Sequence, residues 1–479
     1  MPERPVGPDL LPASPARTAP TAHAVRRPRW RLALGLALVC GGLAGAAGAR
    51  CIDEEVFDPA KAFGPAPAGT PGAVDARAAA QQLVRDALLR SNGIGAARLL
   101  TEASEQDVAE VMASRRPQAA LTGSLEPSMN RGSSGDGAHA AARAGVTLSQ
   151  IVYDGGRTDR LVDWRRQQSE ATRLGMLSAQ EQVALAALSL AYERSRWRMQ
   201  VVIYNQYVRK MTCLVEALES IVNTDRGRTS ELVQARKQAQ QAELQQAQAV
   251  SQSRLIEARL RRMAGDGLPS PDGMASLMLK VPELPEVLSA AEQSFDIASM
   301  DANALAMRQY ARAVEASTRP QVSWNVGGSA LVSSQQASNG SGSSNGASLS
   351  AGVTVSIPLL NPATDHSIQA ARKRSEAASL QRAEALEARR QRIVEAHEQA
   401  SAAFDRVKRV GSVLRDSERL RNFTLQQWQQ LGRRSLFDVM SAEADHYNLR
   451  VQYINALHDG GQLNAMLTSL GGGLTQWLQ

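Results

Sequence analysis

The feature that most constrains the fold is a long helical repeat in residues 363–431. This stretch contains no proline and one glycine, Gly411. At about 1.5 Å of rise per residue, it predicts a helix roughly 100 Å long. Its apolar residues recur every seven positions, as Leu386, Ile393, Ala400, Val407 and Leu414. A sustained heptad predicts left-handed supercoiling against neighbouring helices, and a coiled-coil rod would satisfy this stretch taken alone.

The composition favours an elongated helical protein over a thick globular core. The chain has 479 residues, more than one usual core holds, and only 4% are aromatic against 43% hydrophobic. Contacts between helices through small apolar residues fit these figures. The formal charge is +7, but residues 1–49 carry six Arg against Glu3 and Asp9 and so account for +4. Since no concentrated basic patch remains, we do not expect nucleic-acid binding.

Residues 1–49 have the pattern of an export signal. A basic region is followed by a short apolar run and by small residues that end at Ala49, where cleavage is expected. The apolar run is too short to favour a membrane-spanning helix. Residues 50–74 are rich in Pro, Gly and Ala and predict a flexible segment. Cleavage would leave Cys51 and Cys213, which we expect to be incidental, and no lipoprotein signal precedes Cys51.

After residue 75 the chain follows one plan, with two moderate helices, a strand hairpin, a long helix and a return helix. Glycines, prolines and changes of hydrophobic period mark the boundaries. The predicted elements of this first repeat, residues 75–264, are helices over 76–90 and 96–114 with a break at Asn92-Gly93, a hairpin over 118–152, a long helix over 158–222, and a return helix over 229–263 after Gly227.

A proline-rich linker over 265–285 separates this repeat from a second one. Residues 351–356 (AGVTVS) restate residues 144–149 (AGVTLS), and residues 432–435 (GRRS) restate residues 227–230 (GRTS). The spacing of about 205 residues is kept throughout, as expected of a tandem duplication. The second repeat, residues 286–470, comprises helices over 286–295 and 297–317, a hairpin over 321–358, a long helix over 363–431 and a return helix over 436–470, and a tail follows over 471–479.

Both hairpins alternate apolar and small polar residues over about ten positions, as lipid-spanning barrel strands do. We predict a lipid-facing side made of Val322, Trp324, Val326, Val353 and Val355. A β-sandwich strand with one wet face has the same alternation. The membrane is favoured because the chain is expected to be exported and because the flanking helices are far too long to cover the hairpins.

Four strands cannot close a barrel, and open strand edges are not tolerated in lipid. Closure therefore requires strands from other copies of the chain. Three copies would supply twelve strands around a polar lumen. Their helices would then leave one end of that barrel together and surround a tunnel. The predicted fold is mainly α with a β part, namely a long α-helical barrel joined to a transmembrane β-barrel.

Three segments stand out, namely residues 116–118 (RPQ), 153–157 (YDGGR) and 432–439 (GRRSLFDV). In their order and spacing, the chain after residue 75 resembles, over nearly its whole length, the TolC family of outer-membrane efflux proteins. The resemblance implies a homotrimer in outer-membrane lipid with a 12-stranded barrel and a long periplasmic α-barrel. It also implies two partners, a periplasmic adaptor (membrane fusion) protein and an inner-membrane transporter.

In the family, the two turns between helices lie at the periplasmic tip, where an acidic ring selects cations. Asp438 matches the first acidic position, whereas the second falls on Ser441. Arg434 matches a basic latch residue, but the latch tyrosine falls on Gln429 and an acidic latch partner falls on Val233. The resemblance further implies that the turns dock the adaptor, through Gly227, Arg228, Ser230, Gly432, Arg433 and Ser435. By itself, Asp438 would be an exposed residue near a helix start.

The sequence carries no phosphate-binding loop, nucleophile elbow or metal-ligand spacing, so we expect neither an enzyme nor a cofactor. His446 and His458 are expected to be surface residues. Two classes of function remain, an export channel and an exported coiled-coil stalk, and the duplicated strand alternation favours the channel. The missing lipoprotein signal favours the branch of the family that serves one-step (type I) secretion through an ABC exporter. Multidrug efflux is the alternative.

Overall fold

The computed structural model describes residues 75–130, 137–337, 340–431 and 434–478. Two compact units divide the chain, residues 1–48 and 49–479, and every described residue belongs to the second. The expected signal segment 1–49 and flexible segment 50–74 lie outside the described residues.

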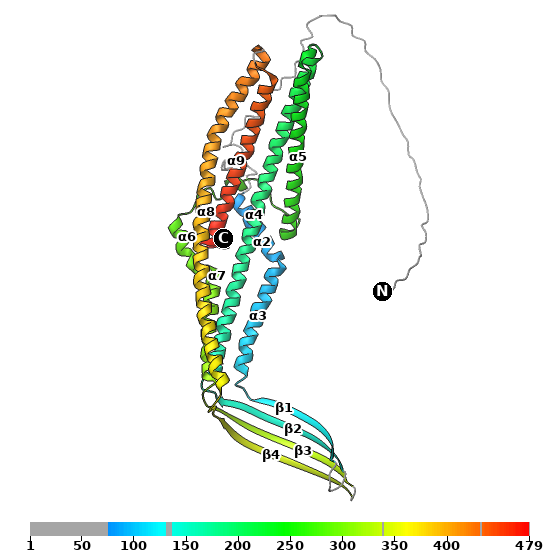
Figure 1. Ribbon diagram of the computed structural model, residues 1–479, viewed down its shortest axis with the longest axis vertical. Helices are drawn as coiled ribbons and strands as arrows, with labels where there is room; N and C mark the ends of the chain where they lie inside the picture. The colour runs from blue at the N-terminus through cyan, green and yellow to red at the C-terminus, as the bar shows by residue number, and fades with distance from the viewer. Residues whose placement is uncertain (1–74, 131–136, 338–339, 432–433, 479) are drawn as a thin grey trace, which may run out of the picture. The chain divides into compact units, whose positions relative to one another are not determined.

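Two long helices run through the described part of the chain, and each is followed by an antiparallel return helix. Helix α4 (Arg157–Val222) leads through a short 3-10 turn, η1 (Arg226–Arg228), to α5 (Thr229–Ala264). Helix α8 (Pro362–Leu431) leads to α9 (Leu436–Leu470). Figure 1 shows α4 beside α5 and α8 beside α9. The long α8 predicted from the heptad is therefore present.

The shorter helices precede each hairpin. Helices α2 (Ala76–Arg90) and α3 (Asn92–Ala113) precede the first hairpin, whereas α6 (Leu284–Ala290), the 3-10 turn η3 (Ala291–Gln293) and α7 (Phe295–Ala316) precede the second. We expected Asn92-Gly93 to break the first pair, but the break lies at Ser91. The Ser91 hydroxyl accepts a hydrogen bond from the Ile94 amide and begins α3 one residue later.

The four strands form one antiparallel sheet in the order β1-β2-β3-β4. The strands are β1 (Gln118–Asn130), β2 (Gly137–Tyr153), β3 (Gln321–Ala337) and β4 (Gly340–Ser356). Strand β2 of the first hairpin pairs with β3 of the second along almost their whole lengths, with a register shift between Ile151 and Tyr153. The expected mainly α fold with four strands per chain is confirmed, and β1 and β4 are the edge strands of this sheet.

The junction between sheet and helices is fixed by the turn before α4. Gly155 and Gly156 have φ values of +65° and +83°, which other residues rarely adopt. Asp154 accepts hydrogen bonds from the amides of Gly156 and Thr158, at 3.1 and 2.6 Å. Burial raises the pKa of Asp154, but these bonds and the Arg115 guanidinium outweigh burial and hold the pKa below its ordinary value. The Arg319 guanidinium donates to the Gly155 carbonyl and so joins the two repeats.

The apolar core is distributed along the long helices α4 and α8 rather than gathered in one place. One cluster joins α2, α4 and the C-terminal residues around Leu188 and Tyr192. A second cluster joins α4, α5, α8 and α9 around Met211 and Tyr447. A third lies between α8 and α9 around Ile393. The two repeats therefore share their core instead of folding separately.

Within the described residues, one helix, α4, holds an 18-residue window with a mean hydropathy of 1.2, apolar and long enough to cross a membrane. Of that window, 28% is buried inside the described structure.

The expectations for the two histidines and for Cys213 were wrong. His446 and His458 were expected at the surface, but each side chain is only 1% exposed because α9 packs against α4. Cys213 was expected to be incidental, but it is disulfide-bonded. The expected tail contains a short helix, α10 (Leu474–Leu478).

Candidate functional site

The first tip turn joins α4 to α5 and is organised by Asp225, which was not among the predicted site residues. Asp225 accepts a hydrogen bond from the Gly227 amide at 3.0 Å and lies 3.8 Å from the Arg228 guanidinium. Helix α4 already ends at Val222, so Gly227 does not cause the break as expected. An aspartate two residues before a glycine is typical of such a turn, so the sequence contained a signal for the role of Asp225. Ser230 lies exposed in the first turn of α5.

The second tip turn joins α8 to α9 and holds the predicted gate residue. Ser435 caps α9, since its hydroxyl accepts a hydrogen bond from the Asp438 amide at 3.3 Å. The Asp438 carboxylate lies 3.8 Å from the Arg434 guanidinium, and both side chains are about half exposed, at 41% and 50%. Arg434 also donates to the Gln427 amide oxygen at 3.2 Å. Gly432 and Arg433 lie outside the described residues.

The other predicted gate residues are not gathered around Asp438. Ser441 and Gln429 are exposed, on α9 and near the end of α8, and Val233 is 63% exposed on α5. In the part of the chain that the structure describes, no hydrogen bond or ion pair joins Asp438 to any of these three. A single chain therefore presents one exposed carboxylate, paired locally with Arg434, at its second tip turn.

The strand register places all five predicted lipid-facing residues on one side of the sheet. Val322 pairs with Val355 and Trp324 pairs with Val353, and directly paired residues point to the same side. Leu148 of β2 pairs with Val326 and continues the apolar side. The other side carries small polar residues, and hydroxyl contacts join Ser329 to Ser348 and Ser333 to Ser344 at 2.9 and 2.8 Å.

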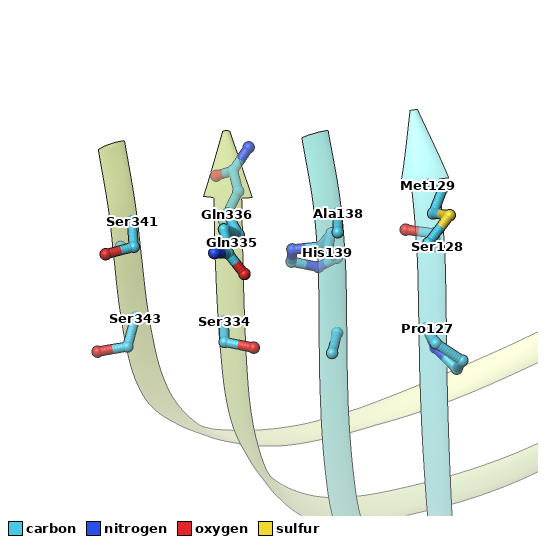
Figure 2. A pocket seen from close by; sticks show the side chains of 12 residues that line it. Pro127, Ser128, Met129, Ala138, His139, Ser334, Gln335, Gln336, Ser341 and Ser343 are labelled. Carbon is cyan, nitrogen blue, oxygen red and sulfur yellow. The ribbon is translucent and has the colours of Figure 1, made fainter. Parts of the chain in front are cut away.

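The apolar side ends before the strands do. Beyond Val332 the paired residues are polar, as in Ser334 with Ser343 and Gln336 with Ser341. A hollow of about 660 Å³ lies against these strand ends and is lined by their serines and glutamines, with His139 and Met129 (Figure 2). The apolar band therefore lies next to the helices, and the strands extend past it.

A buried ionic cluster lies between α4, α8 and α9, and its members were not among the predicted site residues. The Glu443 carboxylate is fully buried and lies 3.4 Å from the Lys210 ammonium and 3.6 Å from the Arg421 guanidinium. Arg450 donates to the Gln206 amide oxygen at 2.6 Å. The signal in the sequence was Lys210, which stands directly before the heptad residue Met211 in the apolar pattern of α4.

This cluster controls the ionisation of a neighbouring histidine. Burial, together with the charges of Arg421, Arg450 and Lys210, lowers the pKa of His446 to about 3. His446 is therefore neutral at physiological pH. Beside it, the rings of Tyr207 and Tyr447 pack with centroids 4.8 Å apart, and the Arg450 guanidinium lies 5.2 Å from the Tyr447 centroid.

One charged residue from each long helix holds the C-terminal turn. The Glu181 carboxylate accepts hydrogen bonds from the amides of Leu474 and Thr475, at 2.8 and 3.1 Å. The Arg389 guanidinium donates to the Leu470 carbonyl at 2.9 Å and pairs with Asp296 at 2.5 Å. Burial lowers the pKa of Arg389 from its ordinary value. These contacts are structural, because the Glu181 carboxylate binds the turn and the Arg389 guanidinium binds both the turn and Asp296.

Within the described residues, no group of three or more His, Cys, Asp or Glu side chains could hold a metal ion. The features that could act on other molecules are the apolar and polar sides of the sheet and the exposed carboxylates of Asp225 and Asp438 at the two tip turns.

No protein-family model matches this sequence, and no curated protein matches it. Several solved structures are similar in fold. CusC, described for its folding and transmembrane channel formation, superposes with a TM-score of 0.70 at 17% identity, over 82% of this chain and 92% of its own. VceC, an outer membrane protein of Vibrio cholerae, superposes at 0.67 with 18% identity, over 83% and 96%.

The MtrE outer membrane channel of Neisseria gonorrhoeae, in its open state, superposes at 0.66 with 17% identity, over 82% of this chain and 89% of its own. The coverage is high on both sides of each comparison. At identities this low, the superpositions establish a shared fold alone, that of a long helical tunnel joined to strands of a β-barrel.

Proposed function

We propose that this chain is one protomer of a trimeric outer-membrane channel of the TolC family, which exports substrate across the periplasm to the outside. The observation that carries the proposal is the sheet. It has an apolar and a polar side in register across the strands, and its edge strands are β1 and β4. Such a sheet is stable in lipid only when both edges are paired.

Three copies would pair β4 of one chain with β1 of the next and give twelve strands. The polar side, with its serine hydroxyl contacts, would then line a wet lumen, and the apolar side would face lipid. The long helices would continue the lumen into the periplasm. The outer-membrane setting of VceC and MtrE and the shared fold support this arrangement.

In this trimer, three copies of Asp438 would converge at the periplasmic end of the tunnel. A ring of three carboxylates attracts cations and repels anions, and binds divalent cations where the passage is narrow. The exposure of Asp438 supports this role, since a carboxylate must face the passage to act on ions. The pair with Arg434 in the same chain would moderate the charge of the ring.

For the cargo, we favour a large polypeptide secreted in one step with a periplasmic adaptor and an ABC exporter. The chain as a whole resembles the outer-membrane component that exports cyclolysin, an RTX toxin, and it has no lipoprotein signal. The alternative is the outer duct of a multidrug efflux pump. An exported coiled-coil stalk is disfavoured, because a stalk has no use for a sheet with one apolar and one polar side.

Deletion of the gene would separate the two cargoes. The secreted proteins and the drug susceptibility of the deletion strain are compared with those of the parent and of a complemented strain. We expect one large secreted polypeptide to disappear while susceptibility stays unchanged. Unchanged secretion with increased susceptibility would favour the efflux pump instead.

The channel itself is tested on purified protein in planar bilayers. We expect discrete conductance steps, increased in an Asp438→Ala, Arg434→Ala double variant. Failure of both proteins to conduct would contradict the channel and favour the stalk.

A further inference from the structure

Each strand of the first hairpin has an equivalent strand in the second. Residues 116–118 (RPQ) lead into β1, and residues 319–321 (RPQ), 203 positions later, lead into β3. Residues 144–149 (AGVTLS) lie in β2, and residues 351–356 (AGVTVS), 207 positions later, lie in β4. These two offsets assign to each residue of β1 and β2 an equivalent residue in the second repeat.

The strand registers of the two hairpins obey this equivalence. Gln118 of β1 pairs with Ser149 of β2. The equivalent residues are Gln321 of β3 and Ser356 of β4, and these two also pair with each other. The offsets therefore describe the strand pairing as well as the sequence. They can be applied to the one remaining contact in the sheet, that of β2 with β3.

The contact of β2 with β3 has an equivalent that a single chain cannot make. Leu148 of β2 pairs with Val326 of β3. The equivalent of Leu148 is Val355 of β4, and the equivalent of Val326 is Gly123 of β1. Strands β1 and β4 lie at opposite edges of the sheet (Figure 1), so a contact between them requires a second copy of the chain.

We propose that β4 of one copy pairs antiparallel with β1 of the next copy in the register that places Val355 opposite Gly123. The inference rests on the proposed trimer and specifies how its copies join. In this register Thr354 lies opposite Ser124, so two hydroxyls meet on the polar side, whereas Val355 and Gly123 meet on the apolar side. A shift by one residue would place each apolar residue of β4 opposite a residue of the polar side of β1.

The register also extends β4 beyond its end in a single chain. Strand β2 continues to Tyr153, because Tyr153 pairs with Val322 of β3 after the register shift. The equivalent of Tyr153 is Leu360, which follows the end of β4 at Ser356 and is 88% exposed. In the assembled protein Leu360 lies opposite Ala119 of the next copy, and the apolar segment between them and β4 becomes strand.

The exposure of the two edges favours a second copy as their partner. Leu121 of β1 is 81% exposed, whereas its equivalent Trp324 has a neighbouring strand on each side and is partly buried. In the proposed register Leu121 lies opposite Ile357, which is 55% exposed. Pairing therefore removes apolar surface from both edges at once and satisfies the open backbone groups of both strands.

The register is tested by disulfide cross-linking in outer-membrane fractions after addition of an oxidant. Thr354→Cys is combined in one chain with Ser124→Cys, Thr122→Cys or Glu126→Cys, the last two being one pleat away on the same side of β1. Directly opposed Cα atoms lie about 4.5–5.5 Å apart, within reach of a disulfide, whereas diagonal ones lie about 7–8 Å apart. We expect about tenfold more covalent trimer from the Ser124 combination than from the other two, lost on reduction.

The three double variants keep the same native cysteines and differ only in the register that they probe. A further combination, Leu360→Cys with Ala119→Cys, tests the extension of β4 and should also give covalent trimers.

More covalent trimer from the Thr122 or Glu126 combination would overturn the register and leave the trimeric channel intact. Trimers in detergent that no combination cross-links would overturn the pairing of β4 with β1. Protein that is monomeric before heating would contradict the proposed trimer and the register together, so the two failures are distinguishable.

Discussion

At the scale of single residues, Asp438 carries the predicted selectivity. We expect Asp438→Ala to weaken cation selectivity and block by divalent cations in planar bilayers. Trimer assembly should be unaffected, because an exposed pair such as Asp438 with Arg434 contributes at most about 1 kcal/mol. The control is Asp416→Ala, which removes a more exposed pair of α8, with Arg419 at 3.4 Å. Full selectivity in the Asp438 variant would refute the gate assignment.

The buried His458 predicts a loss of stability in acid. Its Nε2 accepts from the Ser195 hydroxyl at 3.1 Å, its Nδ1 donates to the Ile454 carbonyl at 2.8 Å, and burial lowers its pKa to about 4. The unfolded state binds a proton as the pH falls below about 6.5, whereas the folded state does not. The stabilisation is therefore complete above pH 6.5 and is lost progressively toward pH 4.

The measurement is the denaturant midpoint at pH 7.5 and at pH 5. We expect His458→Gln to reduce the difference between the two pH values, by up to about 1.4 kcal/mol per pH unit. The exposed His366 of α8 provides the control, since His366→Gln should leave the difference unchanged. An undiminished difference in the His458 variant would contradict the contribution of this histidine.

Glu181 gives a prediction about the C-terminal turn. Glu181→Ala leaves the buried Leu474 amide and the partly buried Thr475 amide without their acceptor and should cost about 3 kcal/mol, measured from the denaturant midpoint. Glu181→Gln, which keeps one acceptor oxygen, should cost less. The exposed Glu384 of α8 is the control position. Equal stability of the two Glu181 variants would contradict the role of the retained oxygen as a hydrogen-bond acceptor.

At the scale of elements, the two sides of β4 can be tested against each other. Val353 lies on the apolar side and Thr354 on the polar side, and both are exposed in one chain. In a lipid-facing position near mid-membrane, an arginine costs about 2–4 kcal/mol. We expect Val353→Arg to reduce assembled protein in the membrane and Thr354→Arg to be tolerated. The reverse order would mean that the sides are exchanged.

The elements with a strong period could be predicted from the sequence. The heptads of α4 and α8 and the alternation of β3 and β4 each bury or expose a regular set of residues, and the predicted ends lie within a few residues of the observed ones. The break at Ser91 was missed because Gly93 was expected to break the helix, whereas the Ser91 hydroxyl caps α3. The burial of His446 and His458 was missed because periodicity assigns a face but does not name the helix that covers it.

The candidate site was harder to predict than the fold. The exposure of Asp438 is a local property of a capped helix start, and the sequence indicated it. The cluster of Lys210, Arg421 and Glu443 comes from three helices, and no pattern within one helix shows that their charges meet. Contacts between distant segments of this kind need the packed structure.

At the scale of the whole molecule, a closed ring of three chains is the assembly that pairs every strand edge. We expect the protein from membranes to migrate as a trimer in detergent and as a monomer after heating, as closed barrels resist mild denaturation. Native mass spectrometry would measure the same stoichiometry directly. A monomer before heating would contradict closure by three copies.

The pairing of β2 with β3 has an evolutionary consequence. It joins the second strand of one repeat to the first strand of the next, and the expected contact of β4 with β1 of another chain joins the same two kinds of strand. A ring of six chains, each half as long, would have the same neighbours throughout. Gene duplication and fusion could therefore shorten such a ring to three subunits without inventing a new interface, after which the two halves were free to diverge.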